Sequence, residues 1–255
     1  MNTINSSRFT ANRSGLSTMN YSVLTACLNS ERTIGRSIDS VLSQKIHPSE
    51  YIFVDGGSAD ATLRIIRENN FKTGFKIIDQ KEKTGITGAW NLGLAEVKTD
   101  IVMILNSDDW YEPDAVSEIL GAFEDNPDAG IVYGSIYFHK GRGKYLRNCR
   151  PLWMFPLMMP IAHPSCFVRK SVYDKLGFFD QEYSISADYE FLYRCYREGV
   201  KFCEIRKPLV NMELGGTANS NRAVARRETR EIARRYCRFP ILPELAYLAR
   251  LVSDR

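Results

Sequence analysis

The chain has 255 residues, of which 44% are apolar and 25% charged, with a formal net charge of +4. These values are typical of a globular protein with a hydrophobic core, and no apolar run is long enough to span a bilayer. Six cysteines without a C-x-x-C pair or metal-like spacing predict free thiols in a reducing compartment. The first twenty residues lack the apolar part of a secretory signal, so we expect a disordered segment over 1–20.

Short apolar runs alternate with helical patterns through the first half of the chain. The runs predict five strands, at Tyr21–Leu28, Tyr51–Val54, Phe75–Ile78, Ile101–Leu105 and Gly130–Phe138. Ser30 is the expected N-cap of the helix after the first strand. A helix over Gly88–Val97 is expected to turn three residues inward, Ala89, Leu92 and Ala95. This alternation is typical of an α/β fold, with a mostly parallel, Rossmann-like sheet and helices on both faces.

The alternation of apolar runs and helical patterns ends after Phe138. Lys140–Lys144 is typical of a hairpin turn, Ser186–Glu198 of a helix and Lys201–Leu214 of a closing strand. Between them, Pro151–Ala162 is apolar and interrupted by proline. This segment either belongs to the core, as a cover over the sheet edge, or forms an exposed lip that faces a lipid-like acceptor.

Two adjacent acids, Asp108 and Asp109, follow the fourth predicted strand. Open α/β sheets bind their ligands at the carboxyl ends of such strands. Two neighbouring carboxylates repel each other unless a cation lies beside them. A divalent ion held by one carboxylate and by substrate phosphates would meet that need. The structural alternative is a polar turn in which Asp109 caps the next helix.

Two further acids lie at comparable places. Asp55 ends the second predicted strand beside two glycines, where a ligand and backbone amides can approach closely. Asp188 lies in the first turn of a predicted helix. Each has a structural alternative, because Ser58 and Asp60 are good helix caps and a helix dipole favours an acid in its first turn.

In their order along the chain, these motifs resemble those of family 2 glycosyltransferases. The matching segments are Asp55-Gly-Gly-Ser-x-Asp60, Leu105-Asn-Ser-Asp-Asp109, His163-x-Ser-x-Phe-Val-Arg169, Gly177-Phe-Phe-Asp180 and Ala187-Asp188-Tyr189-Glu190. The resemblance is greatest to the branch that builds bacterial colanic-acid and O-antigen polysaccharides. It implies a GT-A fold over 21–217, with a nucleotide-sugar-binding half over 21–110 and an acceptor-binding half over 111–217.

The resemblance also implies roles for individual residues. Asp188 would be the catalytic base, and Asp109 would bind Mg²⁺ or Mn²⁺. Five residues would bind the donor: Asp55, Asn91, Asp108, Gly215 and Gly216. His163 and Glu190 would contact the acceptor. A single base opposite the leaving nucleotide implies inversion at the anomeric carbon.

The donor-binding half also departs from the usual family pattern. Gly56 stands where a second aspartate is common, and Lys81 and Lys83 stand where acids are common. The sequence therefore leaves the donor sugar and the nucleotide base open.

The last part of the chain, over 218–255, is expected to be a basic helical tail. Seven arginines and two glutamates lie between Arg222 and Arg238, several of them at helical spacing. The tail is either a solvated helix packed on the domain or an interfacial helix attracted to the anionic inner leaflet of a membrane. We expect no nucleic-acid partner, because no aromatic recognition strand accompanies the arginines.

The sequence thus predicts an inverting, metal-dependent glycosyltransferase. It would move a sugar from a nucleotide-diphosphate donor to a glycan acceptor, lipid-linked, in cell-surface polysaccharide synthesis. We expect it in the cytoplasm, at the inner face of the membrane. One alternative is a nucleotidyltransferase, although Leu28–Arg32 lacks the glycine-rich phosphate loop such an enzyme needs. The other is a non-catalytic membrane-surface module with a vestigial site.

Overall fold

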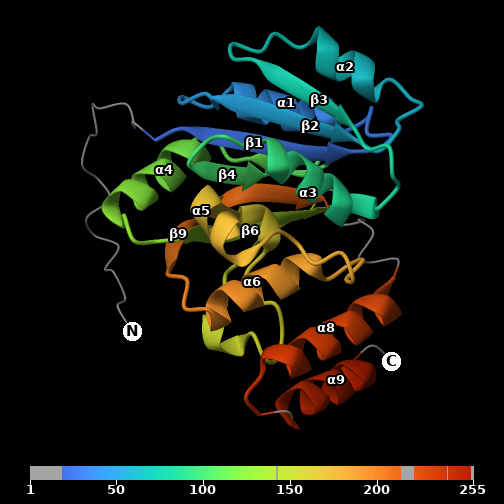
Figure 1. Cartoon of the computed structure of the whole chain (residues 1–255), viewed down its shortest axis with the longest axis vertical. Coiled ribbons are helices and arrows are strands. Elements are labelled where there is room, and N and C mark those ends of the chain that lie inside the picture. Colours follow the sequence, from blue (N-terminus) through green and yellow to red (C-terminus); the bar gives the residue numbers. More distant parts are fainter. Residues whose placement is uncertain (1–18, 142, 214–220, 240, 254–255) are drawn as a thin grey trace.

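The computed structural model describes residues 19–141, 143–213, 221–239 and 241–253. Within these ranges the strands form one nine-stranded sheet (Figure 1). Its strand order is β3-β2-β1-β4-β8-β6-β9-β5, and β7 pairs with β6.

The first half of the sheet is parallel. Its elements are β1 (Tyr21–Cys27), α1 (Ile34–Leu42), β2 (Glu50–Asp55), α2 (Thr62–Glu68), β3 (Phe75–Asp79), α3 (Gly85–Glu96) and β4 (Ile101–Ile104). β1 pairs in parallel with β2 and β4, and β2 pairs in parallel with β3. The carboxyl ends of these four strands therefore lie at one edge of the sheet.

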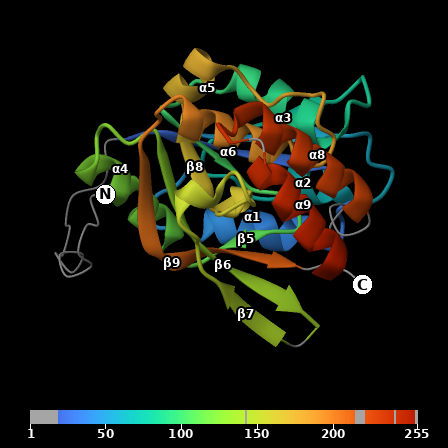
Figure 2. The ribbon, with the colours of Figure 1, turned by 90° about the horizontal axis from the view of Figure 1, so that it is seen from below.

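The second half of the sheet is mixed. Its elements are β5 (Trp110–Tyr111), α4 (Ala115–Asp125), β6 (Ile131–Lys140), β7 (Gly143–Arg147), the 3₁₀ turns η2 (Leu152–Met154) and η3 (His163–Ser165), β8 (Cys166–Arg169), α5 (Lys170–Leu176), α6 (Ala187–Arg197) and β9 (Phe202–Glu213). β8 lies antiparallel between β4 and β6, and β6 is parallel to β9. The hairpin of β6 and β7 projects from the body of the protein (Figure 2). Two helices, α8 (Arg222–Tyr236) and α9 (Ile241–Ser253), follow.

Two hydrophobic cores lie on opposite faces of the sheet. In β1, Leu24 belongs to the core that includes residues of α3, α5 and α6, whereas Val23 belongs to the core that includes residues of α1 and α4. All seven residues of β1 are buried. A strand covered on both faces is apolar throughout, which is why the sequence shows runs instead of alternation. The predicted fold class, a mostly parallel α/β sheet with helices on both faces, is confirmed.

The orientation of α3 differs from the prediction. Leu92 is 42% exposed and Ala95 is exposed, whereas Trp90 and Gly93 face the core. Gly93 explains the difference, because a Cβ atom there would lie 2.1 Å from Leu24 Cδ1. The glycine face of α3 lies closest to β1, so the prediction that Leu92 and Ala95 point inward is wrong.

The apolar segment over 151–162 divides between its two interpretations. Phe155 is fully buried and stacks on Tyr193 of α6, with ring centroids 5.2 Å apart. Trp153 is 58% exposed. The segment is therefore a cover that adds Phe155 to the core and leaves one large aromatic side chain at the surface.

Two simpler expectations can be compared with the structure. All six cysteines are free thiols, as predicted. Within the described ranges, every helix is too short or too polar to cross a membrane.

Candidate active site

Three loops meet at the carboxyl edge of the parallel strands. The loop after β1 is bonded to the loop after β2, since the Asn29 amide donates to Ser58 Oγ at 2.9 Å and the Ala59 amide donates to Asn29 Oδ1 at 2.9 Å. The Ser30 hydroxyl lies 2.8 Å from that of Ser107, in the loop after β4. Ser30 therefore joins two loops, and its predicted role as side-chain cap of α1, which begins at Ile34, is wrong.

Asp55 organises the second of these loops. Its carboxylate is 4% exposed and accepts hydrogen bonds from the amides of Gly57 and Ser58, at 3.0 and 2.9 Å, and from the Ser58 hydroxyl at 2.6 Å. Burial and the charge of Asp55 raise the pKa of the neighbouring Cys27 thiol to about 12, so the thiol is neutral. Asp55 thus lies at the predicted carboxyl edge of the sheet, where its hydrogen bonds give it a structural role. Its contact with a donor stays a prediction.

Asp109 is a buried acid with few partners. Its side chain is 2% exposed, and Asn106 Nδ2, at 3.1 Å, is the one hydrogen-bond donor to this carboxylate among the described residues. Burial and the charge of Asp108 raise the pKa of Asp109 well above its usual range. Burial also raises the pKa of Asp108. The pair therefore lies where an added cation would be stabilised.

Arg36 of α1 lies beside this acidic pair. Its guanidinium donates to the Asp108 carbonyl at 3.2 Å and to Glu213 of β9 at 2.8 Å. It also covers the Trp110 ring, 3.6 Å from the ring centroid. Arg36 could not be identified from the sequence, because nothing in the local pattern of α1 distinguishes it from a solvated arginine.

The oxygen atoms around Asp109 fit a hard divalent cation. The Asn106 Oδ1 atom is buried and has no hydrogen-bond partner among the described residues. Within the same ranges no group of three or more acidic, histidine or cysteine side chains could hold a metal ion. Mg²⁺ is commonly bound by one or two carboxylates together with waters and substrate phosphates.

Asp188 lies in the first turn of α6, as predicted. Its Oδ1 atom accepts a hydrogen bond from the Tyr189 amide at 2.7 Å. Burial raises the pKa of Asp188 to about 6, which is near neutrality for a carboxylic acid. Perturbed acids of this kind are concentrated at functional sites.

Asp188 interacts electrostatically with Cys166 of β8. β8 is antiparallel to β4 and pairs Phe167 with Met103, so Cys166 lies toward the carboxyl end of β4. Burial, and after it the charges of Cys149 and Asp188, raise the pKa of the Cys166 thiol. Asp188 is thus coupled to Cys166 of β8, the strand paired with β4, whereas the charged groups that shift its own pKa are Glu228 and Arg147. That Asp188 shares one site with Asp108 and Asp109 stays a prediction.

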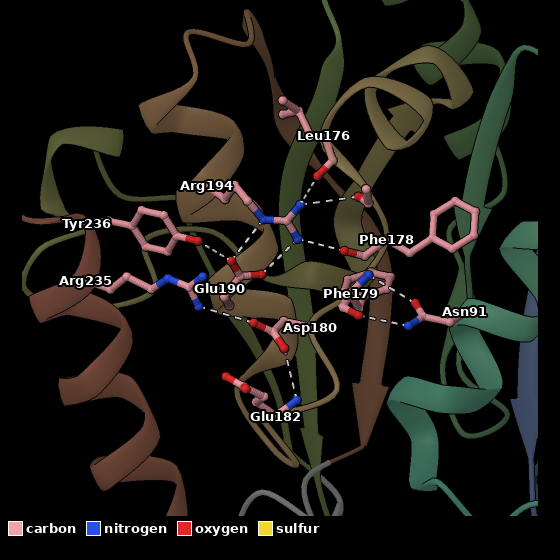
Figure 3. A network of polar contacts seen from close by, with 11 residues as sticks. Asn91, Leu176, Phe178, Phe179, Asp180, Glu182, Glu190, Arg194, Arg235 and Tyr236 are labelled. Atoms are coloured by element: carbon pink, nitrogen blue, oxygen red, sulfur yellow. Dashed lines mark hydrogen bonds and ion pairs between the residues drawn. The ribbon is translucent and has the colours of Figure 1, made fainter.

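Asn91 and His163 lie in a cluster around Phe179. The Asn91 side chain donates to the Phe179 carbonyl at 2.8 Å and accepts from its amide at 3.0 Å (Figure 3). The His163 ring is 3% exposed and lies 4.9 Å from the Trp90 ring centroid. Burial lowers the pKa of His163 to about 4, so it is neutral. These contacts give both residues a structural role, and their predicted ligand contacts remain predictions.

Glu190 is the centre of a buried ion pair (Figure 3). It is 1% exposed, and its oxygens accept from Arg194 Nε at 2.9 Å and Nη2 at 3.0 Å and from the Tyr236 hydroxyl. Arg194 also donates to the carbonyls of Leu176 and Phe178. The network joins α6, α8 and the loop after α5, so these contacts account for Glu190 without an acceptor. The remaining predicted donor residues, Gly215 and Gly216, lie outside the described residues.

The model of the family described as "Glycosyl transferase family 2" matches residues 22–179. The chain belongs to this family. The match includes Asp55, Asp108 and Asp109 and ends before Asp188, so the assignment of the base rests on the position and environment of Asp188 alone.

Similar proteins agree with this family membership. The chain is 33% identical, over 114 residues, to a poly-beta-1,6-N-acetyl-D-glucosamine synthase of Staphylococcus epidermidis. The aligned residues make up 45% of the chain and 28% of that protein. It is 24% identical, over 204 residues, to a PGL/p-HBAD biosynthesis glycosyltransferase of Mycobacterium bovis, covering 78% of the chain and 79% of the relative. The chain thus spans less than a third of the first relative and about four fifths of the second.

A solved structure shows the same fold. S. aureus TarS 1–349, in complex with UDP-GlcNAc, superposes with a TM-score of 0.69 at 17% identity, over 90% of this chain and 70% of that chain. The GT-A fold expected from the sequence is confirmed by this likeness.

Replacing Arg194 with alanine tests the buried ion pair. We expect Arg194→Ala to lower the free energy of unfolding by about 3–5 kcal/mol, because the Glu190 carboxylate would stay buried without its counter-ion. Urea denaturation measures the change. Arg197→Ala, in the exposed last turn of the same helix, is the matched control and is expected to stay within about 0.5 kcal/mol of the wild type. Equal stability of the two variants would contradict this account.

Proposed function

We propose that the protein is an inverting glycosyltransferase that uses a nucleotide-diphosphate sugar, a UDP-sugar, and Mg²⁺ or Mn²⁺. The observations that support the proposal are a poorly partnered acidic pair in the loop after β4 and, in the first turn of α6, a buried acid whose pKa is about 6. The relatives' names refer to an N-acetylglucosamine polymer and to PGL/p-HBAD biosynthesis, and the TarS structures hold UDP or UDP-GlcNAc. They favour a UDP-sugar donor and a glycan acceptor of cell-surface polysaccharide synthesis.

The proposed reaction needs one proton acceptor. Asp188 accepts the proton of the acceptor hydroxyl while that oxygen attacks the anomeric carbon and the nucleoside diphosphate leaves. An acid with a pKa of about 6 is ionised at neutral pH and still basic enough for this transfer. Attack opposite the leaving group inverts the anomeric carbon, and no covalent enzyme intermediate forms.

The other residues bind and orient the donor. Asp109, with Asp108 beside it, is the proposed metal-binding residue, and the loop built on Asp55 is the proposed nucleotide contact. A bound Mg²⁺ or Mn²⁺ supplies Lewis-acid stabilisation of the charge on the leaving diphosphate. Arg36 holds the backbone of Asp108 and so fixes the direction of the pair.

The first experiment measures nucleotide release from a panel of UDP- and GDP-sugars with a lipid-linked glycan acceptor. We expect Asp188→Asn to lower kcat about 10²–10⁴-fold while calorimetric donor binding is retained. In the wild type, kcat/KM is expected to rise as pH increases through about 6, because Asp188 must lose its proton to act as a base. Full activity of Asp188→Asn would refute the mechanism. Donor binding without turnover in the wild type would favour a non-catalytic module, and pyrophosphate release a nucleotidyltransferase.

The metal site has its own test. We expect Asp109→Asn to raise the Mn²⁺ concentration needed for half-saturation, measured by electron paramagnetic resonance in the presence of UDP, since an amide is a weaker ligand than a carboxylate. Asp100→Asn, exposed at the other end of β4, is the control and is expected to bind Mn²⁺ as the wild type does. Unchanged Mn²⁺ binding in Asp109→Asn would remove Asp109 from the metal site.

We further propose that the α8–α9 pair binds an anionic membrane surface, where a lipid-linked acceptor would be presented. Along α9, Ile241, Leu245 and Leu248 are more than half exposed, and their spacing puts them on one face. Arg227 of α8 and Arg238, in the segment between α8 and α9, are exposed. The exposed apolar stripe is complementary to the apolar part of a lipid surface, and the basic helix beside it is complementary to the anionic headgroups. Figure 1 shows the two helices side by side at one end of the molecule.

Vesicle sedimentation tests this surface. We expect binding to vesicles that contain anionic phosphatidylglycerol, weakened by salt and absent with phosphatidylcholine alone. The double variant Arg227→Gln/Arg238→Gln is expected to bind about 30-fold more weakly, at about 1 kcal/mol per arginine. Arg64→Gln/Arg67→Gln, on the exposed face of α2, is the matched control and is expected to bind normally. Equal binding of both double variants, or of both kinds of vesicle, would refute the proposal.

A further inference from the structure

One side chain of α8 is bonded to the residues that precede α6. Glu228 is 5% exposed, although it carries a charge. Its Oε1 atom accepts from the Ser184 amide at 2.9 Å and from the Ser184 hydroxyl at 2.8 Å. Its Oε2 atom accepts from the amides of Ile185 and Ser186, at 3.0 and 2.8 Å. Four hydrogen bonds thus satisfy one buried carboxylate, and three of them come from consecutive backbone amides.

These bonds hold the backbone just before α6, at the positive end of its dipole. The first amides of a helix have no partner within the helix, and they form the positive end of its dipole. Ser186 is the N-cap residue of α6, but within the described part of the chain its hydroxyl makes no capping bond and points instead to the Ala225 carbonyl at 3.4 Å. Glu228, 42 to 44 residues away, places a negative charge at this end of α6 from another helix.

The clamped amides directly precede the proposed base. One residue, the buried Ala187, separates Ser186 from Asp188. Because the backbone on the N-terminal side of Asp188 is held by Glu228, the direction of the Asp188 side chain depends on α8. We propose that Glu228 is a positioning residue for the transfer reaction, which fixes the first turn of α6 and with it the Asp188 carboxylate. This inference rests on the proposed role of Asp188 as the base.

Glu228 also acts on Asp188 through its charge. The charged and titratable groups around Asp188 are Glu228 from α8, Arg147 from β7 and Cys166 from β8. Burial raises the pKa of Glu228, but the bonds from Ser184, Ser186 and Ile185 outweigh it, so the pKa lies below its usual value. Glu228 is therefore ionised throughout the range in which Asp188 titrates. Its negative charge opposes ionisation of Asp188, so removal of the charge lowers the pKa of Asp188.

A purely structural role for Glu228 has to be distinguished, because α8 makes other contacts with the domain. Ile232 and Ala233 are buried, and the Tyr236 hydroxyl bonds to Glu190 (Figure 3). A residue that only holds α8 in place would change stability when replaced. It would leave the kcat of the folded protein unchanged.

The test uses the full chain with Glu228→Gln, and Glu231→Gln as the control, since Glu231 is an exposed glutamate on the same helix. The carboxyl of Asp188 is titrated by ¹³C NMR, and kcat and KM are measured across pH. For Glu228→Gln we expect Asp188 to titrate at lower pH, the acidic limb of kcat/KM to move in the same direction, and kcat to fall about 10-fold or more at unchanged donor KM. For Glu231→Gln we expect wild-type values.

A second variant separates charge from geometry. Glu228→Asp keeps the charge on a shorter side chain, so the acidic limb is expected to stay at its wild-type pH while kcat falls. If Glu228→Gln does not fold, the kcat of Glu228→Asp decides the question. A wild-type kcat in Glu228→Asp would overturn the inference. Unchanged Asp188 titration and kcat in a folded Glu228→Gln would overturn it as well. The titration requires no turnover, so an inactive wild type would refute the proposed function while the link between Glu228 and Asp188 is still measured.

Discussion

The arrangement of this protein depends on how its buried carboxylates are satisfied. A buried charge is costly unless hydrogen bonds or an opposite charge compensate it. Asp55, Glu190 and Glu228 receive such partners from loops or helices, and each thereby fixes a join between segments. Asp109 and Asp188 are less well compensated, and burial raises the pKa of both. The first group is needed for folding, whereas the second is left to interact with a cation or a reacting hydroxyl.

This division explains how the C-terminal helices are joined to the domain. α8 buries Ile232 against the core, and its polar side chains reach the start of α6 and the pair of Glu190 with Arg194. The same helix turns arginines outward, toward the surface that we assign to the membrane. In the proposed function, a helix with these two faces would orient the base on one side and face the membrane on the other. The tail that the sequence set apart from the domain is thus packed on α6.

The sequence was informative wherever the signal was local. Buried strands are apolar throughout, so β1 to β4 and the acids at their carboxyl ends could be placed from the sequence alone. β5 and β8 were missed because two and four residues are too few for a period to be recognised. The inward face of α3 was missed because Gly93 carries no hydrophobic side chain, yet it makes the closest approach to β1. Arg36 and Glu228 were missed because their partners lie more than forty residues away in the chain.

The boundary of the family match points to where this chain acquires its specificity. The matched segment, 22–179, contains the parallel strands and the acidic pair, which are the parts that any nucleotide-sugar donor requires. The proposed base and its clamp lie beyond it, in α6 and α8. The diphosphate of a nucleotide sugar has the same chemistry whatever the sugar, whereas acceptors differ in shape and in the position of the attacking hydroxyl. A base whose direction is set by a separate helix can be re-aimed by changes in that helix, without disturbing the loops that bind the donor.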